Sequence, residues 1–305
     1  MVDNFLNAKY DDFELQILMD CKRKSKFFVC IFILFTEVTV LSYACTPLIE
    51  NLSRNESDKA FPFRMWIKSI PLQETPYYEI CYTVQAVSVY MVGRTYFSLD
   101  NILCIINLHL AGQFRMLQYR LSEKYTKNQK KNDESRNLLD LANNATDIFK
   151  SCIRQHQALV EYCEEVDAVF SPCVLIQVLA FSIFICLDGY QMLLVDIFER
   201  QIIFVFHFLG TVCQLVMFSY SCDCIIRESE LLATAAFSGP WLQLPSSKRI
   251  ENLKKDFIML IMRSYKSCYI SGLGFFIVSL ETSTRVLTTA GSYFTLLQET
   301  QTKVD

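Results

Sequence analysis

The sequence predicts an all-α polytopic membrane protein. The chain has 305 residues, 52% of them hydrophobic, and its apolar residues are gathered into long runs instead of being spread at the spacing of a soluble core. Five runs are long enough to cross a bilayer, because a helix rises about 1.5 Å per residue against about 30 Å of hydrocarbon. Lys and Arg are also distributed unequally between the connecting segments, as a membrane topology requires.

The composition argues against several other classes. A net charge of −3 offers no basic excess for nucleic acid. Most of the 13 cysteines fall within or beside apolar runs, where Cys behaves as a small hydrophobe, and the three histidines are scattered. We therefore expect no metal and no other cofactor. No Gly-rich phosphate loop, nucleophile elbow or His-x-x-x-His is present, so the sequence does not predict an enzyme.

The N-terminal third is expected to contain a cytoplasmic segment and two membrane helices. Residues 1–25 are charged and resemble a loop. Residues 26–111 hold the two helices, at about 26–48 and 78–111, and the outer loop 49–77 joins them.

Three charged residues fall well inside these two predicted spans, away from their ends. They are Glu37, Arg94 and Asp100. An intramembrane charge costs roughly 2.5–3.5 kcal/mol on insertion scales, so such residues normally face a partner or a polar cavity. The sequence alone does not decide between these roles and does not pair the three.

The middle of the chain alternates cytoplasmic and membrane segments. Residues 112–169 form a predicted cytoplasmic helical region, and 170–226 hold two further membrane helices. Residues 227–267 are cytoplasmic and include a basic amphipathic stretch over 249–266. Apolar residues recur at near-helical spacing over 138–167, which fits either a solvated hairpin or a cytoplasmic bundle packed with 249–266.

Lys and Arg counts predict the orientation. With a cytoplasmic N-terminus, the inner segments carry 21 Lys and Arg and the outer segments carry 6. The outer loop also holds two glycosylation sequons, at Asn51 and Asn55, which are usable only on the lumenal side. Both features place the C-terminus outside the cell membrane.

The last segment, residues 268–305, is predicted to be a pore-lining transmembrane helix over 268–297 and a short outer tail. Its apolar stretch is unusually rich in Ser and Thr, which a helix surrounded by lipid does not need. Glu281 and Arg285 stand at i, i+4 spacing. They form either a self-neutralising pair or a contact with permeating ions or a neighbouring subunit.

Aromatic and Met side chains gather in the outer halves of the first four spans. They fit either an interfacial belt or, where they converge between helices, the wall of an apolar pocket for a small ligand.

The order of several motifs resembles insect odorant receptors. The most specific is Gly272-Leu-Gly-Phe-Phe-Ile-Val-Ser-Leu-Glu-Thr, followed by Thr289-Ala-Gly-Ser-Tyr-Phe-Thr-Leu-Leu297. Looser matches are Phe61-Pro-Phe63 in the outer loop and Tyr78, Tyr82 and Gln85 at the next helix. The resemblance covers essentially the whole chain.

That resemblance implies a seven-helix fold and a tetrameric ligand-gated cation channel, in which an odorant-binding subunit joins a shared coreceptor. The five spans would correspond to the family's third to seventh helices. The chain is therefore expected to lack the first two helices, as a partial sequence, a mispredicted gene start or a degenerate copy.

The resemblance also implies site residues. A small volatile apolar odorant would be bound in the outer half of the membrane by Val40, Tyr43, Tyr82, Val89 and Phe184. Leu296 would stand at the hydrophobic gate, with Thr295 and Gln298 beside it. A membrane transporter and a non-functional receptor fragment remain as alternative interpretations.

Overall fold

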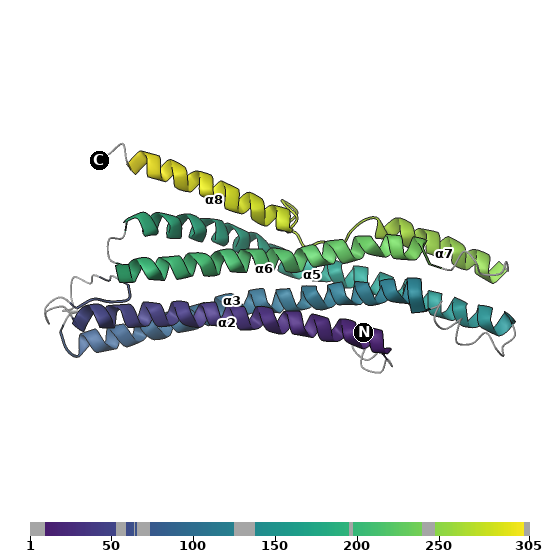
Figure 1. Cartoon of the computed structure of the whole chain (residues 1–305), viewed down its shortest axis with the longest axis horizontal. Helices are drawn as coiled ribbons and strands as arrows, with labels where there is room; N and C mark the ends of the chain where they lie inside the picture. Colours follow the sequence, from purple (N-terminus) through teal and green to yellow (C-terminus); the bar gives the residue numbers. More distant parts are fainter. Residues whose placement is uncertain are drawn as a thin grey trace. The chain divides into compact units, whose positions relative to one another are not determined.

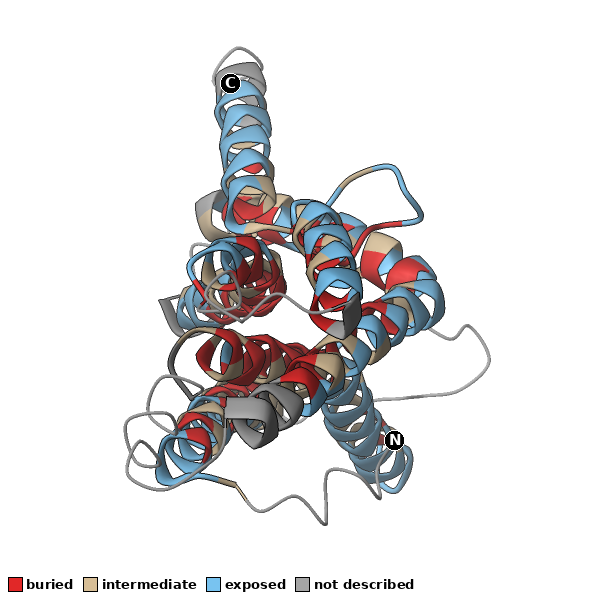
Figure 2. Ribbon diagram, turned by 90° about the vertical axis from the view of Figure 1, so that its right-hand side faces the viewer, coloured by how far each residue is buried: buried red, intermediate tan, exposed pale blue. Residues whose placement is uncertain are grey.

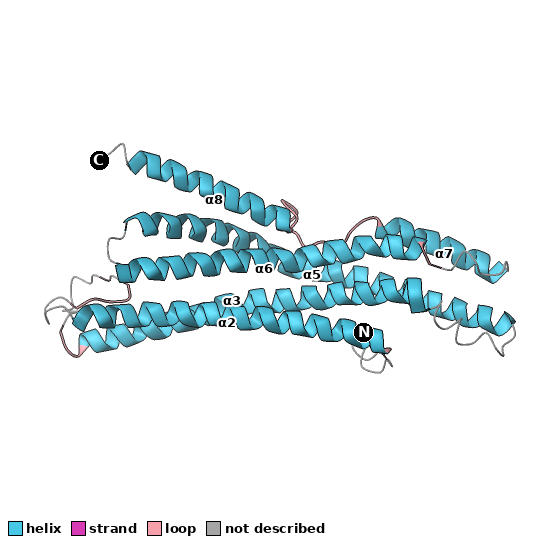
Figure 3. Cartoon of the chain, in the orientation of Figure 1, coloured by secondary structure: helices cyan, strands magenta, loops and turns pink. Residues whose placement is uncertain are grey.

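The computed structural model describes residues 10–52, 59–63, 65, 74–124, 138–194, 198–239 and 248–301. This part of the chain is helical almost throughout (Figure 3), as the sequence predicts. The described helices are α2 (Asp12–Leu52), α3 (Tyr77–Tyr119), the π-helical turn η1 (Arg120–Lys124), α5 (Leu138–Leu194), α6 (Phe198–Phe237), α7 (Lys248–Ser264) and α8 (Leu280–Gln301).

Several helices are longer than a membrane is thick. Helix α5 has 57 residues, so the predicted cytoplasmic helix over 138–167 and the following span form one continuous element. Pro172 lies inside it without ending it. Helix α2 carries Asp12 and Glu14 in its first turn, where carboxylates interact favourably with the helix dipole.

Three of the described helices are long and apolar enough to cross a membrane. They contain the stretches Asp12–Asn51, Thr146–Met192 and Gln201–Phe237. Buried and exposed residues occupy different sides of the helices (Figure 2), and many exposed side chains are large and apolar, among them Leu34, Ile176 and Ile183. Exposed apolar faces of this kind suit contact with lipid. Membrane spanning by α3 and α8 stays a prediction.

The chain divides into two compact units, which are described separately. Unit 1 comprises Met1–Lys26, Cys104–Leu175 and Ser219–Leu280. Unit 2 comprises Phe27–Leu103, Ile176–Phe218 and Glu281–Asp305.

In unit 1, α5 packs against α7. The rings of Phe149 and Phe257 meet edge to face with centroids 5.2 Å apart, and both are fully buried. His156 Nε2 lies 3.3 Å from Ser264 Oγ. Of the two interpretations of 138–167, the packed bundle is therefore the one that the structure supports.

The buried carboxylate of Glu14 belongs to a polar network that connects α2, η1 and α5 in unit 1. Glu14 is wholly buried and lies 2.7 Å from Arg120 Nε of η1. The same guanidinium donates through Nη1 to Gln155 Oε1 of α5, also at 2.7 Å. A buried charge is tolerated when it is paired and hydrogen-bonded in this way.

The predicted helix over 268–297 is wrong over residues 268–279, since α8 begins at Leu280. Residues 268–279 instead form a tight hairpin-like turn, in which Val278 N donates to Ile270 O and Gly272 N donates to Phe276 O, both at 2.9 Å. Leu273 and Gly274 both have positive φ, at 50° and 74°.

Side chains of neighbouring helices hold this turn. Asp167 Oδ1 accepts from Ser271 N at 2.6 Å, and Ser171 Oγ accepts from Leu273 N at 2.6 Å. Ser229 Oγ accepts from Cys268 N at 3.0 Å. These acceptors satisfy backbone donors that a continuous helix would otherwise satisfy itself, so the helix is not required here.

In unit 2, α2 and α3 lie side by side (Figure 1). Arg94 Nη1 lies 2.8 Å from Glu37 Oε1, which pairs two of the three charges within the predicted spans. Tyr82 donates its hydroxyl to the backbone oxygen of Ala44.

Candidate functional site

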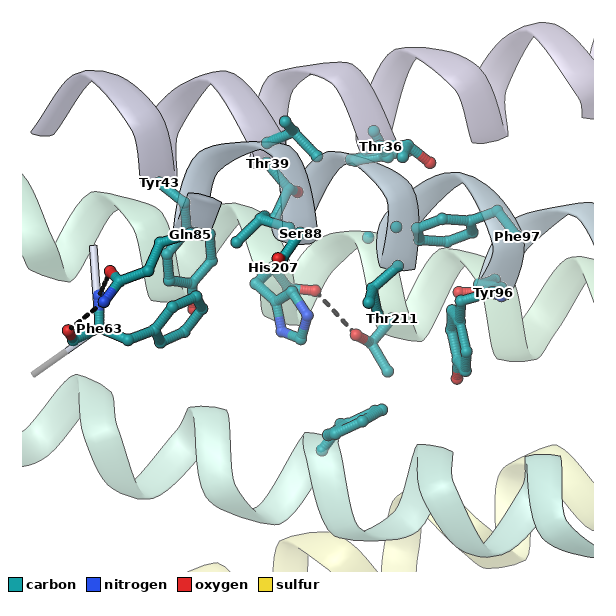
Figure 4. Close-up of a pocket in the computed structure, with 18 of the residues that line it drawn as sticks. Thr36, Thr39, Tyr43, Phe63, Gln85, Ser88, Tyr96, Phe97, His207 and Thr211 are labelled. Atoms are coloured by element: carbon teal, nitrogen blue, oxygen red, sulfur yellow. Dashed lines mark hydrogen bonds between the residues drawn. The ribbon is translucent and has the colours of Figure 1, made fainter. Parts of the chain in front are cut away.

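Unit 2 contains a cavity of about 600 Å³ (Figure 4). Helices α2 and α3 supply most of its wall, α5 supplies Phe184, and α6 supplies four further residues. Aromatic and aliphatic side chains predominate. The lining residues are Phe35, Thr36, Thr39, Val40, Tyr43, Phe63, Met65, Val84, Gln85, Ser88, Val89, Val92, Gly93, Tyr96, Phe97, Phe184, His207, Gly210, Thr211 and Gln214. Its volume lies within the range of small-molecule sites, about 300–1,000 Å³.

Three hydroxyls of the wall bond to their own helices. Thr36 Oγ1 donates to Phe32 O, and Ser88 Oγ donates to Val84 O, both at 2.7 Å. Thr211 Oγ1 donates to His207 O at 2.9 Å. Their hydrogen atoms are thus already engaged, and the wall is more apolar than its composition suggests.

A short segment of the connection between α2 and α3 borders the cavity. Gln85 Oε1 accepts from Phe63 N at 3.1 Å, while its Nε2 donates to Phe63 O at 3.3 Å. The Phe63 ring stacks on Tyr43 with centroids 5.7 Å apart. These contacts, visible in Figure 4, position the loop beside α2 and α3.

A buried polar cluster lies at the part of the wall where α3, α5 and α6 meet. Asp100 is 4% exposed and accepts at Oδ2 from Gln177 Nε2, at 2.8 Å, and from Gln214 Nε2. Gln177 Nε2 also donates to the hydroxyl oxygen of Tyr96 at 2.8 Å. Asp100 thus has hydrogen-bond donors on α5 and α6, whereas Glu37 and Arg94 pair with each other.

His207 of α6 presents its imidazole ring to the cavity. Its Nδ1 lies 2.7 Å from Oδ2 of Asp188, a residue that is 6% exposed. The Phe184 ring meets the imidazole edge to face, with centroids 5.9 Å apart.

Four of the five predicted ligand-binding residues line this cavity, namely Val40, Tyr43, Val89 and Phe184. Tyr82 does not line the cavity, and its hydroxyl donates to the backbone oxygen of Ala44 on α2. Ligand binding by any of them stays a prediction.

The sequence reasoning did not single out Tyr96, His207 or Gln214. Aromatic character alone could have brought attention to Tyr96. His207 and Gln214 give a weaker signal, a polar residue within an apolar span, and which helix they face depends on the tertiary packing.

The predicted gate residues lie on α8. Thr295, Leu296 and Gln298 are exposed in the isolated chain, Leu296 by 57%. Arg285 Nη2 lies 2.6 Å from Glu281 Oε1, so these two residues form the intrahelical pair that their spacing predicts.

The two predicted glycosylation sites differ in what the structure shows. Asn51 Nδ2, the atom that would carry a glycan, donates to Tyr78 Oη at 2.7 Å and to Ala60 O at 3.2 Å. Attachment there would displace one of these bonds. Asn55 lies outside the described residues. Modification of either residue stays a prediction.

Long apolar helices and a mostly apolar cavity between them define a polytopic helical membrane protein able to enclose a small molecule. The chain belongs to the insect odorant receptor family: the profile described as "7tm Odorant receptor" matches residues 9–291.

Individual relatives agree. Odorant receptor 13a of Drosophila melanogaster is 24% identical over 85% of this chain and 63% of its own length. Odorant receptor 10 of Aedes albopictus is 24% identical over 79% of this chain and 60% of its own length. The chain thus spans less than two thirds of the length of these receptors.

Solved structures show the same fold. The insect olfactory receptor OR5 from Machilis hrabei in complex with eugenol matches with a TM-score of 0.76 and 14% sequence identity, over 97% of this chain and 73% of that one. A second structure of OR5 from Machilis hrabei matches with a TM-score of 0.72 and 15% sequence identity, over 92% of this chain and 66% of that one.

Proposed function

We propose that this protein is the odorant-binding subunit of a heteromeric ligand-gated, non-selective cation channel in the membrane of olfactory neurons. The observation that carries the proposal is the mostly apolar cavity of about 600 Å³ within unit 2. A small volatile molecule would enter it because burial of apolar surface is favourable by roughly 25 cal/mol per Å². Membership of the odorant receptor family supports this ligand class.

Helix α5 offers a route from the cavity to the pore-lining helix. Phe184 lines the cavity, and less than two turns later Cys186 and Gly189 approach α8. Cys186 Sγ lies 3.9 Å from Ala290 O, and a Cβ at Gly189 would lie 3.0 Å from the Phe294 ring. A ligand that displaces Phe184 would move α5 against α8. It can shift the channel equilibrium only by binding the open form more tightly.

The pore itself would be lined by α8 of four subunits. Its exposed residues, including Leu296, would then face the conduit or a neighbouring subunit. A ring of Leu side chains excludes ions when it is narrow, because an apolar constriction loses its water. In this proposal the coreceptor supplies the remaining subunits, the N-terminus is cytoplasmic and the C-terminus is extracellular.

Expression with the coreceptor and recording of odour-evoked current tests the proposal. Val89→Trp would fill the cavity and should abolish responses to all odorants, since Val89 is a lining residue. Val87→Trp is the matched control: Val87 lies two residues away on α3, is exposed and does not line the cavity. It should leave the responses in place.

The outcomes separate the alternatives. Equal responses from the two Trp variants would contradict binding in this cavity. Ligand-dependent solute uptake without current would favour a transporter. A chain that reaches the surface with the coreceptor but never responds would favour a non-functional receptor.

A further inference from the structure

His207 differs from the other polar residues of the cavity wall. The hydroxyls of Thr36, Ser88 and Thr211 donate to their own helices, and the amides of Gln85 and Gln214 bond to other protein groups. A free hydroxyl, such as one on Tyr43, can rotate to donate or accept and so selects weakly between ligands. The imidazole is fixed, because Nδ1 bonds to Asp188 and Phe184 packs against the ring. Among the described residues, none hydrogen-bonds to Nε2 of His207.

The surroundings of the Asp188–His207 pair decide whether Nε2 is a hydrogen-bond donor or an acceptor. Asp188 and His207 lie in two of the apolar helical stretches, and Asp188 is nearly inaccessible to solvent. An apolar environment disfavours net charge, so the pair is most stable with a total charge of zero. Such a pair holds two hydrogens, one between Nδ1 and Oδ2 and one on Nε2. If the shared hydrogen is bonded to Nδ1, the ring is an imidazolium beside a carboxylate, and Nε2 carries the second hydrogen. If the shared hydrogen rests on the carboxyl group, Asp188 donates to Nδ1 and the neutral ring again carries its hydrogen on Nε2.

In both arrangements Nε2–H is a donor that points away from Asp188. The third arrangement, a carboxylate beside a neutral ring protonated on Nδ1, would leave one uncompensated negative charge in apolar surroundings. It would make Nε2 an acceptor, and it is the arrangement that burial disfavours.

We propose that His207 Nε2–H donates a hydrogen bond to the ligand, and that the preferred ligands are small, otherwise apolar molecules with one carbonyl oxygen: ketones, aldehydes or esters. This inference rests on the proposed function and narrows its ligand class. The apolar wall accommodates the hydrocarbon part, and His207 sets its orientation. Asp188 is a positioning residue, since it acts through the imidazole.

The test compares two ligands of the same shape, heptan-2-one and 2-methylhept-1-ene, in which CH₂ replaces the carbonyl oxygen. Both are applied to cells expressing the full chain with the coreceptor, and the concentration for half-maximal current is measured. The wild type should respond to the ketone at about tenfold lower concentration, the worth of one hydrogen bond to a buried partner. His207→Phe should bring the two concentrations together while the alkene response remains.

Two further variants make the comparison specific. His207→Gln retains an N–H donor at the same number of bonds from Cα, but lacks the ring that Asp188 and Phe184 hold in place, and should keep part of the ketone preference. His109→Phe makes the same chemical change on α3 at a residue outside the cavity wall and should keep all of it. Surface labelling verifies delivery, and His207→Leu replaces His207→Phe in the comparison if the latter is retained inside the cell.

An unchanged ketone preference in His207→Phe, or a wild type that responds equally to ketone and alkene, would overturn this inference and leave the proposed function standing. A wild type that prefers the alcohol heptan-2-ol to the ketone would show that Nε2 accepts, and would likewise overturn it. Absence of current to every odorant would instead count against the proposed function.

Discussion

Glu37 and Arg94 illustrate how single residues are accommodated in an apolar chain. Their side chains meet across α2 and α3 with 2.8 Å between Nη1 and Oε1, and both remain partly exposed on the outside of the helix pair. In lipid, removal of one partner leaves the other charge uncompensated, whereas removal of both leaves no charge.

We therefore expect Glu37→Gln and Arg94→Gln each to lower the amount of receptor at the cell surface, and the double variant to recover most of it. Surface biotinylation of the three variants measures this. If the losses of the single variants simply added in the double variant, the pair would not be interacting in the membrane.

His156, in the part of α5 that the sequence predicts to be cytoplasmic, is expected to make the stability of unit 1 depend on pH. Burial, aided by the nearby charge of Arg263, lowers the pKa of His156 to about 4 from its ordinary 6.5. The unfolded chain therefore binds a proton that the folded chain excludes between these two values. Stability is fully present above about pH 6.5 and is lost as the pH falls towards 4, by on the order of 3 kcal/mol at most.

Thermal unfolding of the purified protein in detergent should thus occur at lower temperature at pH 5 than at pH 7. His156→Gln has no titrating ring and should show a smaller difference between the two conditions. An identical pH dependence in the variant would assign the effect to other groups.

At the scale of elements, glycine is favourable in the turn before α8 but unfavourable within the helix itself. Gly274 has φ of +74°, which costs an L-residue roughly 1–2 kcal/mol. Gly291 lies inside α8 with nothing within 4 Å of an added Cβ, and glycine in a helix costs roughly 0.5–1 kcal/mol relative to alanine.

Gly274→Ala should therefore destabilise the purified chain by about 1 kcal/mol, and Gly291→Ala should stabilise it slightly. Unfolding midpoints of the two variants, measured side by side, make each the control of the other. Shifts of the same sign would contradict either the turn or the helix.

At the scale of the whole molecule, the proposed pore requires several copies of α8. Leu296→Ser should raise the current that flows without odorant, because a polar side chain lets water remain in the constriction. Leu209→Ser makes the same change at an exposed residue of α6 and is the control. Patch-clamp recording of basal current and reversal potential measures both. A Leu296→Ser channel with wild-type basal current and selectivity would argue against its place at the gate.

The sequence predicts the presence of the helices more reliably than the residues at which they end or the contacts that they make. The all-α membrane class and the odorant receptor family are confirmed. The start of α8 was placed too early, because the acceptors that support the 268–279 turn come from Asp167, Ser171 and Ser229, far away in sequence.

The sequence by itself determined the class of the protein, since long apolar runs must form helices when no water is available to their backbone groups. It also identified aromatic residues able to form an apolar wall. Tertiary structure decided which residues share that wall, how Glu37, Arg94 and Asp100 are partnered, and that Asp188 stands behind His207. The physical reason is that a helical repeat fixes the direction of each side chain on its own helix but not the neighbour that it meets, which depends on how helices distant in sequence pack.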